Sequence, residues 1–220
     1  MMTDALRGLN APDWPVLYLV FDWATLPPGM DAAELTEEAI LGGVGMVQFR
    51  DKSGVPLEVW LERAASVRGV CRKHGVPFVV NDRVDAVEPL DAEGLHLGQD
   101  DLSLLEGRAR VGSEVAIGIS THDLAQARTA AAAGADYLGF GAMFPTGIKP
   151  DRMPVGCALL RSVAEELELP VYPIGGIGIG NVGQIVAVGV RRCAVISAVM
   201  KAAGVRAAAR ELRQCLDADA

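Results

Sequence analysis

The stretch PIGGIGIGNVGQIV, residues 173–186, decides between two α/β folds. It contains GIGNVG (178–183), which matches the G-x-G-x-x-G pattern that dinucleotide-binding sheets place in their first strand–helix unit. That pattern also needs an acidic residue at the end of the following strand, to hold a ribose. Here the stretch comes late in the chain, and the next apolar run ends in VISAV (195–199), without an acid. The glycines therefore favour a strand-to-helix loop of another fold, one that holds a phosphate or simply turns tightly.

Upstream and downstream of this stretch, short β-branched runs alternate with amphipathic segments, and we count eight such pairs. The expected strands are residues 16–21, 46–51, 77–82, 94–99, 115–120, 136–144, 170–176 and 193–199. The expected helices include 31–43, 56–75, 123–134, 155–167 and 204–216. Eight short units predict a (β/α)8 TIM barrel that occupies residues 1–220 as a single domain, with an open doubly wound sheet as the alternative.

The charge composition of the chain argues against two classes of binding partner. The chain has 220 residues, a formal net charge of −8 and a sequence pI near 4.9. Nucleic acids and anionic membranes select clustered lysine and arginine, so neither is expected as a partner. The N-terminal residues lack an apolar signal core, and no apolar run is long enough to span a bilayer. We therefore expect a cytoplasmic protein that acts on small molecules, and an exposed barrel face could supply the contact of a homodimer.

Polar side chains collect where the expected strands end, which is where (β/α)8 barrels carry their active sites. They are Gln48, Arg50, Lys52, Asn81, Asp82, Asp101, Ser120, Thr146, Lys149 and Ser197, together with Gly176 in the glycine-rich loop.

Two cations, Arg50 and Lys52, stand two residues apart at the end of the second expected strand. On an extended backbone this spacing puts both side chains on one side, so they could converge on one polyanion. The alternative is an ion pair with an aspartate of a neighbouring strand. A further cation, Lys149, follows Thr146 on a loop rich in glycine and proline, and the segment 145–154 is a candidate lid.

Two carboxylates, Asp82 and Asp101, follow adjacent expected strands. Mg²⁺ prefers oxygen ligands and often keeps waters or substrate phosphate as its other ligands, so this pair predicts a Mg²⁺ site. A paired general acid and base would also use two carboxylates, but it favours a more apolar site. The three histidines, His74, His96 and His122, share no metal-ligand spacing and do not indicate a zinc site.

Seven segments in this order and spacing resemble the thiamine phosphate synthase family from Leu17 to Val199. They are VQFRDK (47–52), FVVNDRVD (78–85), GLHLGQDD (94–101), IGISTHDLAQA (117–127), ADYLGFGAMFPTGIKPD (135–151), PIGGI (173–177) and VISAV (195–199). The resemblance implies that hydroxymethylpyrimidine diphosphate is joined to a thiazole phosphate, with Mg²⁺, to give thiamine phosphate and pyrophosphate.

The resemblance also assigns roles by position. It implies that Asp82 and Asp101 bind Mg²⁺. The residues implied to contact the pyrimidine diphosphate or the departing pyrophosphate are Gln48, Arg50, Lys52, Asn81, Ser120 and Lys149, of which Arg50, Lys52, Ser120 and Lys149 would be catalytic. The residues implied to hold the thiazole phosphate are Thr146, Gly147, Ile148, Gly176, Ile196 and Ser197.

Two positions depart from the family pattern. Ile148 stands where the T-x-T-K motif has its second threonine, so one hydroxyl is missing from the expected phosphate site, at a cost of about 0.5–3 kcal/mol if nothing replaces its hydrogen bond. Ala142 stands where synthases usually have proline and where the related thiazole tautomerases place a catalytic histidine. A tautomerase-like enzyme and a non-catalytic barrel that binds thiazole or thiamine phosphate are the alternative functions.

Overall fold

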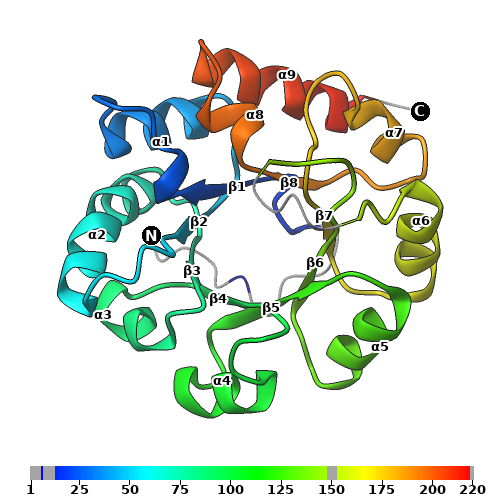
Figure 1. Cartoon of the computed structure of the whole chain (residues 1–220), viewed down its shortest axis with the longest axis horizontal. Helices are drawn as coiled ribbons and strands as arrows, with labels where there is room; N and C mark the ends of the chain where they lie inside the picture. The colour runs from blue at the N-terminus through cyan, green and yellow to red at the C-terminus, as the bar shows by residue number, and fades with distance from the viewer. Residues whose placement is uncertain (1–5, 7–12, 148–152, 219–220) are drawn as a thin grey trace.

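The computed structural model describes residues 6, 13–147 and 153–218, and it is a ring of parallel strands surrounded by helices (Figure 1). The strands are β1 (Leu17–Asp22), β2 (Met46–Arg50), β3 (Phe78–Asn81), β4 (Gly94–Leu97), β5 (Ala116–Thr121), β6 (Tyr137–Phe140), β7 (Val171–Pro173) and β8 (Cys193–Val195). They are hydrogen-bonded in the order β7-β6-β5-β4-β3-β2-β1-β8. The two ends of this order, β7 and β8, are also in contact and close the ring. The predicted (β/α)8 barrel is confirmed.

The helices cover the outside of this ring (Figure 1). The α-helices are α1 (Ala32–Leu41), α2 (Leu57–His74), α3 (Val87–Leu90), α4 (Leu104–Val111), α5 (Leu124–Ala132), α6 (Cys157–Glu166), α7 (Val182–Val186), α8 (Ser197–Met200) and α9 (Val205–Asp217). Two 3₁₀ turns, η2 (Trp23–Thr25) and η3 (Val84–Ala86), follow β1 and β3. Within the described residues, no helix is both long and apolar enough to cross a lipid bilayer.

Alternate residues of each strand face opposite sides of the ring, because side chains of a strand alternate. On β1, Leu17 and Leu19 pack with the helices in the larger hydrophobic core, whereas Tyr18 and Val20 belong to a second core inside the barrel. The same alternation places Gln48, between two outward-facing β2 residues, on the inner side, where it is buried. Inward-facing positions near the carboxyl ends of the strands are therefore the positions that can reach a bound molecule.

Three strands end three or more residues earlier than predicted. The expected strands 136–144, 170–176 and 193–199 end as β-structure at Phe140, Pro173 and Val195. After β7, Gly175 and Gly176 adopt positive φ angles of 98° and 67°, which turn the chain away from the sheet. After β8, the chain turns at Ile196 (φ −119°, ψ −87°) into α8. The prediction that Ser197 ends a strand is therefore wrong: it is the first residue of a short helix.

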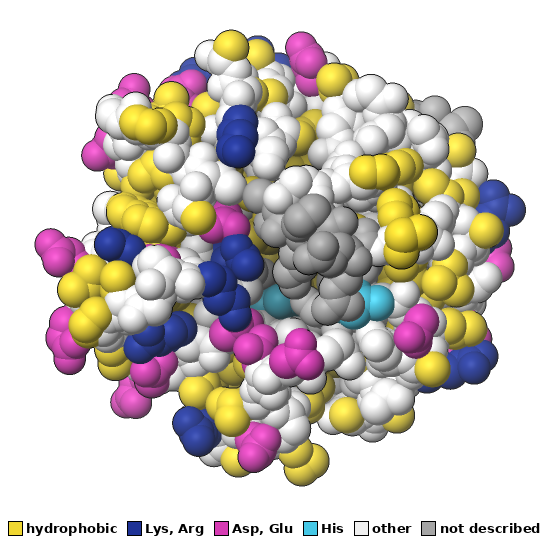
Figure 2. Space-filling view, in the orientation of Figure 1, with side chains coloured by type: hydrophobic (Ala, Val, Ile, Leu, Met, Phe, Trp, Pro, Cys, Tyr) yellow, Lys and Arg dark blue, Asp and Glu magenta, His cyan; other side chains and the backbone are white. Residues whose placement is uncertain are grey.

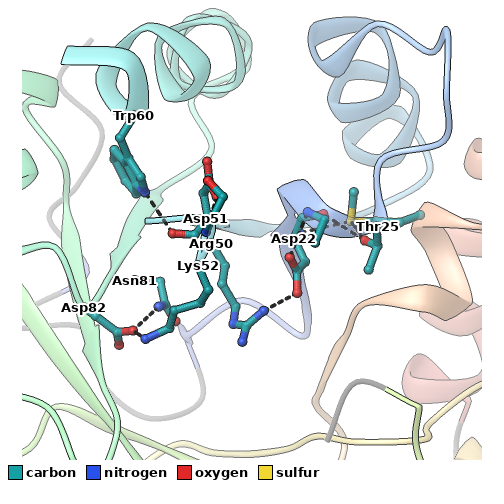
Figure 3. A network of polar contacts seen from close by, with 11 residues as sticks. Asp22, Thr25, Arg50, Asp51, Lys52, Trp60, Asn81 and Asp82 are labelled. Carbon is teal, nitrogen blue, oxygen red and sulfur yellow. Dashed lines mark hydrogen bonds and ion pairs between the residues drawn. The ribbon is translucent and has the colours of Figure 1, made fainter. Parts of the chain in front are cut away.

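Asp51, directly after β2, anchors the loop that carries Lys52. Its carboxylate accepts hydrogen bonds from the Ser53 amide at 2.9 Å and from the Arg63 guanidinium at 2.7 Å. Its carbonyl accepts one from the Trp60 indole at 3.3 Å (Figure 3). Burial alone would raise the pKa of Asp51, but the hydrogen bonds from Ser53 and Arg63 outweigh it and hold this pKa below its usual value.

This lowered pKa makes a prediction about acid stability. A carboxyl whose pKa is lower in the folded than in the unfolded protein stabilises the fold above its unfolded pKa, near 4, and loses that effect as pH falls through the folded value. Asp51→Asn is therefore expected to lower the free energy of unfolding by about 1–2 kcal/mol at pH 7, and by less at pH 3. Urea titrations of both proteins at the two pH values measure this, and a difference that stays constant with pH would contradict it.

Candidate active site

A cavity opens at the carboxyl ends of the strands, and eight of the residues predicted to bind substrate line it. These residues are Gln48, Arg50, Asn81, Ser120, Thr146, Gly176, Ile196 and Ser197. Lys52, Asp82 and Asp101 are not among the lining residues, but Asn81 Nδ2 donates to Asp82 Oδ2 at 2.6 Å and so connects them to the cavity. Gly147 does not line it either, and Ile148 and Lys149 lie outside the described residues.

Lys52, Asp82 and Asp101 form a charged cluster beside the cavity. The Lys52 ammonium contacts the Asp82 carboxylate (Figure 3) and lies 3.9 Å from Asp101 Oδ1. The backbone of Asp82 is left-handed (φ 58°), a conformation that aspartate tolerates better than most residues, and its amide donates to the His96 carbonyl at 2.9 Å. Asp101 Oδ2 accepts from the Gly98 amide at 2.7 Å. Figure 2 shows basic and acidic side chains side by side inside the ring, on the side of β2 to β4.

The donor set of this cluster fits Mg²⁺ better than a transition metal. Two carboxylates, from Asp82 and Asp101, approach one cationic group, Lys52. Among the described residues there is no group of three or more histidine, cysteine, aspartate or glutamate side chains that could hold a metal. Mg²⁺ is commonly held by one or two protein carboxylates plus water and substrate phosphates, so two suffice if the substrate supplies phosphate oxygens.

Arg50 forms an ion pair with Asp22, which the sequence reasoning did not single out. Asp22 ends β1 directly opposite Arg50 in the β1–β2 register, and its side chain is only 2% exposed (Figure 3). Its other carboxylate oxygen accepts from the Ala24 amide at 3.1 Å. The expected alternative, an ion pair between neighbouring strands, is therefore present. Arg50 nevertheless lines the cavity, so the pair holds its guanidinium at the mouth of the site.

The glycine-rich loop after β7 packs tightly against the loop after β6. A Cβ atom added to Gly176 would lie 2.5 Å from the Pro145 carbonyl oxygen and 2.8 Å from Phe144 Cβ, so only glycine fits there. Asn181, the asparagine of GIGNVG, ties this loop together: its Nδ2 donates to the Gly176 carbonyl and its Oδ1 accepts from the Gly178 amide, both at 2.9 Å. The motif thus shapes a loop that lines the cavity.

Tyr18, His96 and Tyr137 were also missed as site residues, and they connect Gln48 to Ser120 inside the barrel. Tyr18 and His96 line the cavity, and Tyr137 is fully buried beneath it. The His96 side chain faces the interior of the barrel. The period of two along the strands could have identified all three, since they share the inward face with the predicted binding residues.

The cavity carries no imidazole at position 142, because Ala142 lines it there. His122, at the end of β5, lines the same cavity, and its Nδ1 lies 2.5 Å from the Gly141 carbonyl oxygen. Position 142 therefore does not supply the catalytic histidine that the tautomerase alternative requires there.

Comparisons with known proteins agree with this geometry. A family model described as thiamine monophosphate synthase matches residues 17–199. The thiamine-phosphate synthase of Shouchella clausii is 41% identical over 191 residues, which are 86% of this chain and 91% of the relative. That of Alkaliphilus oremlandii is 41% identical over 197 residues, 90% of this chain and 93% of the relative.

Solved structures show the same relationship. Thiamine phosphate pyrophosphorylase from Pyrococcus furiosus superposes with a TM-score of 0.83 at 33% identity and covers 99% of this chain and 98% of its own. A geranylgeranylglyceryl phosphate synthase from Thermoplasma acidophilum, 14% identical, has a TM-score of 0.69 over 97% of this chain and 96% of its own, and it shares the fold alone.

Proposed function

The chain belongs to the thiamine monophosphate synthase family and is a transferase, and from this premise we propose that it joins hydroxymethylpyrimidine diphosphate to a thiazole phosphate. The products are thiamine phosphate and pyrophosphate. The observation that carries this proposal is that Arg50 lines a cavity that the glycine-rich loop also lines, with the Lys52–Asp82–Asp101 cluster beside it. A diphosphate and a monophosphate can then be held at separate places, with the reacting carbon between them.

The pyrimidine ring is assigned to the inner part of the cavity. Gln48 and Asn81 are buried there, 3% and 8% exposed, and Ser120 lies at the end of β5 on the same side. Buried polar groups of this kind orient a ligand, because leaving their hydrogen bonds unmade costs about 1–3 kcal/mol each.

The diphosphate is assigned to the cationic end. Breaking the bond between the pyrimidine CH₂ carbon and oxygen leaves a pyrophosphate whose charge grows in the transition state, and fixed cations stabilise that charge. Arg50 would contact this group from the cavity wall, and Lys52 and Lys149 would supply two further positive charges. Asp82 and Asp101 would hold Mg²⁺, which neutralises phosphate charge when bound.

The thiazole phosphate is assigned to the loops after β6, β7 and β8. Thr146, Gly176, Ile196 and Ser197 line the cavity there, and Gly147 and Ile148 follow Thr146 in the sequence. Glycine at position 176 lets the main chain approach phosphate oxygens closely. The thiazole nitrogen attacks the pyrimidine CH₂ carbon with its own lone pair, so no protein nucleophile or obligatory general base is needed.

The decisive experiment mixes the purified protein with both substrates and Mg²⁺ and follows thiamine phosphate and pyrophosphate. We expect both products to form in equal amounts and only when both substrates are present. Binding of both substrates without product would refute the synthase and favour the non-catalytic barrel. Isomerisation of a thiazole phosphate tautomer without the pyrimidine substrate would favour the tautomerase alternative.

Asn181→Ala tests the assignment of the phosphate to the glycine-rich loop. Loss of both hydrogen bonds that Asn181 makes is expected to loosen this loop and to raise the KM for the thiazole phosphate about 5- to 20-fold, with little change in the KM for the pyrimidine diphosphate. Gln184→Ala, which truncates an exposed amide on α7, the helix that begins one residue after Asn181, is the matched control. Equal effects of both variants, or an effect on the pyrimidine substrate alone, would place the phosphate elsewhere.

A further inference from the structure

Five side chains from five strands form one hydrogen-bonded chain through the barrel. Gln48 Nε2 lies 2.5 Å from Tyr18 Oη, which lies 3.1 Å from Tyr137 Oη. Tyr137 Oη lies 3.0 Å from His96 Nδ1, and His96 Nε2 lies 2.9 Å from Ser120 Oγ. The chain thus begins and ends at two residues assigned above to the pyrimidine.

Glycines make room for this chain. A Cβ atom at Gly118 would lie far inside contact distance of the Tyr137 ring, and one at Gly139 would lie 3.2 Å from His96 Cε1. Tyr18 and Tyr137 are 1% and 0% exposed, and burial raises the pKa of both phenols well above the usual value. Both therefore keep their single proton at any physiological pH.

One arrangement of donors lets both tyrosine hydroxyl protons be used within the chain. The Gln48 amide donates to Tyr18, and in this arrangement the Tyr18 hydroxyl donates to Tyr137 and Tyr137 donates to His96 Nδ1. A neutral imidazole that accepts at Nδ1 carries its proton on Nε2, which then donates to Ser120 Oγ. Gln48 keeps its carbonyl oxygen to accept from a ligand, and Ser120 keeps its hydroxyl proton to donate to one.

We propose that Tyr18, Tyr137 and His96 are positioning residues that set Gln48 as an acceptor and Ser120 as a donor toward the substrate. An aminopyrimidine edge carries the complementary pair, an amino N–H and a ring nitrogen. The hydrogen-bonded chain therefore favours binding of the aminopyrimidine over binding of an analogue in which an oxo group replaces the amine. This inference rests on the proposed function, because that function assigns Gln48 and Ser120 to the pyrimidine.

Tyr137→Phe tests it, since this change removes one hydroxyl and leaves the ring in place. We expect the KM for hydroxymethylpyrimidine diphosphate to rise about tenfold and that for the thiazole phosphate to stay within twofold. The preference for the amino over the oxo analogue, measured as a ratio of inhibition constants, should fall about tenfold, because Gln48 can then turn its amide. His96→Gln, which retains an amide N–H that can reach Ser120, should be less impaired than His96→Leu.

Tyr172→Phe is the matched control. Tyr172 is a third buried tyrosine of the barrel, but its hydroxyl donates to the Pro15 carbonyl at 2.6 Å, away from the chain. This variant should lose stability comparably and retain the analogue preference. If Tyr137→Phe does not fold, Tyr18→Phe breaks the same chain one step earlier.

The possible failures are distinguishable. An unchanged analogue preference in Tyr137→Phe and Tyr18→Phe, with wild-type protein active, would overturn the positioning role and leave the proposed function intact. If Tyr172→Phe lost the analogue preference to the same extent, the hydrogen-bonded chain would contribute to stability only. Wild-type protein that binds neither pyrimidine would overturn the proposed function and this inference together.

Discussion

Arg50→Ala is expected to lower kcat by a factor of about 10²–10³, because it removes one fixed cation from the departing pyrophosphate. The same change leaves the Asp22 carboxylate buried without its partner, so the free energy of unfolding should also fall, by about 3–5 kcal/mol. Steady-state kinetics below the melting temperature and urea unfolding measure the two effects separately.

A double variant separates catalysis from stability at this position. Asp22→Asn combined with Arg50→Gln removes both charges, so much of the lost stability should return while kcat stays low. Arg206→Gln is the matched control: its partner Glu38 is 39% exposed, and an exposed pair contributes only about 0–1 kcal/mol. If the double variant recovered both stability and turnover, Arg50 would be a structural residue and not a catalytic one.

Gly118→Ala should be the most damaging change to the barrel interior. The added methyl group overlaps the fully buried Tyr137 ring, so the ring must move within a packed core, which costs about 3 kcal/mol or more. The displaced hydroxyl also leaves the hydrogen-bonded chain between Gln48 and Ser120. Thermal and urea unfolding should therefore show a large loss, accompanied by weaker binding of the pyrimidine diphosphate.

Gly69→Ala is the same substitution at another position, and it is expected to change the free energy of unfolding in the opposite direction. Gly69 lies exposed within α2, and nothing lies within 4 Å of an added Cβ, so the change should stabilise the protein by about 0.5–1 kcal/mol. Similar stability of the two variants would contradict the close packing of Tyr137 against Gly118.

The fold could be predicted because its signals are local. Strands such as β1 are short runs of apolar residues, and helices such as α2 end at glycine with a left-handed backbone, here Gly75. Strand ends were less predictable: Ile196 and Ser197 belong to a mostly apolar run that continues from β8, and nothing in the residue types shows that the backbone turns at Ile196.

The site could be predicted in part, for a related reason. Residues at the carboxyl ends of strands lie close together in any parallel barrel, so the sequence alone could predict that Gln48, Arg50 and Asn81 are neighbours. Asp22 could not, since its importance comes from lying opposite Arg50, 28 residues away, in the register of two strands.

Residue types and their spacing along the chain were sufficient to predict the eightfold alternation of strands and helices, the family, and the set of polar residues at one end of the barrel. The folded barrel determines which of those residues touch. Tyr18 and Tyr137 are 119 residues apart, and the hydroxyl contact between them exists only because the ring closes and Gly118 leaves space for an aromatic ring. It also decided what GIGNVG does: Asn181 holds the turn beside the cavity, and the glycine next to the proposed phosphate is Gly176.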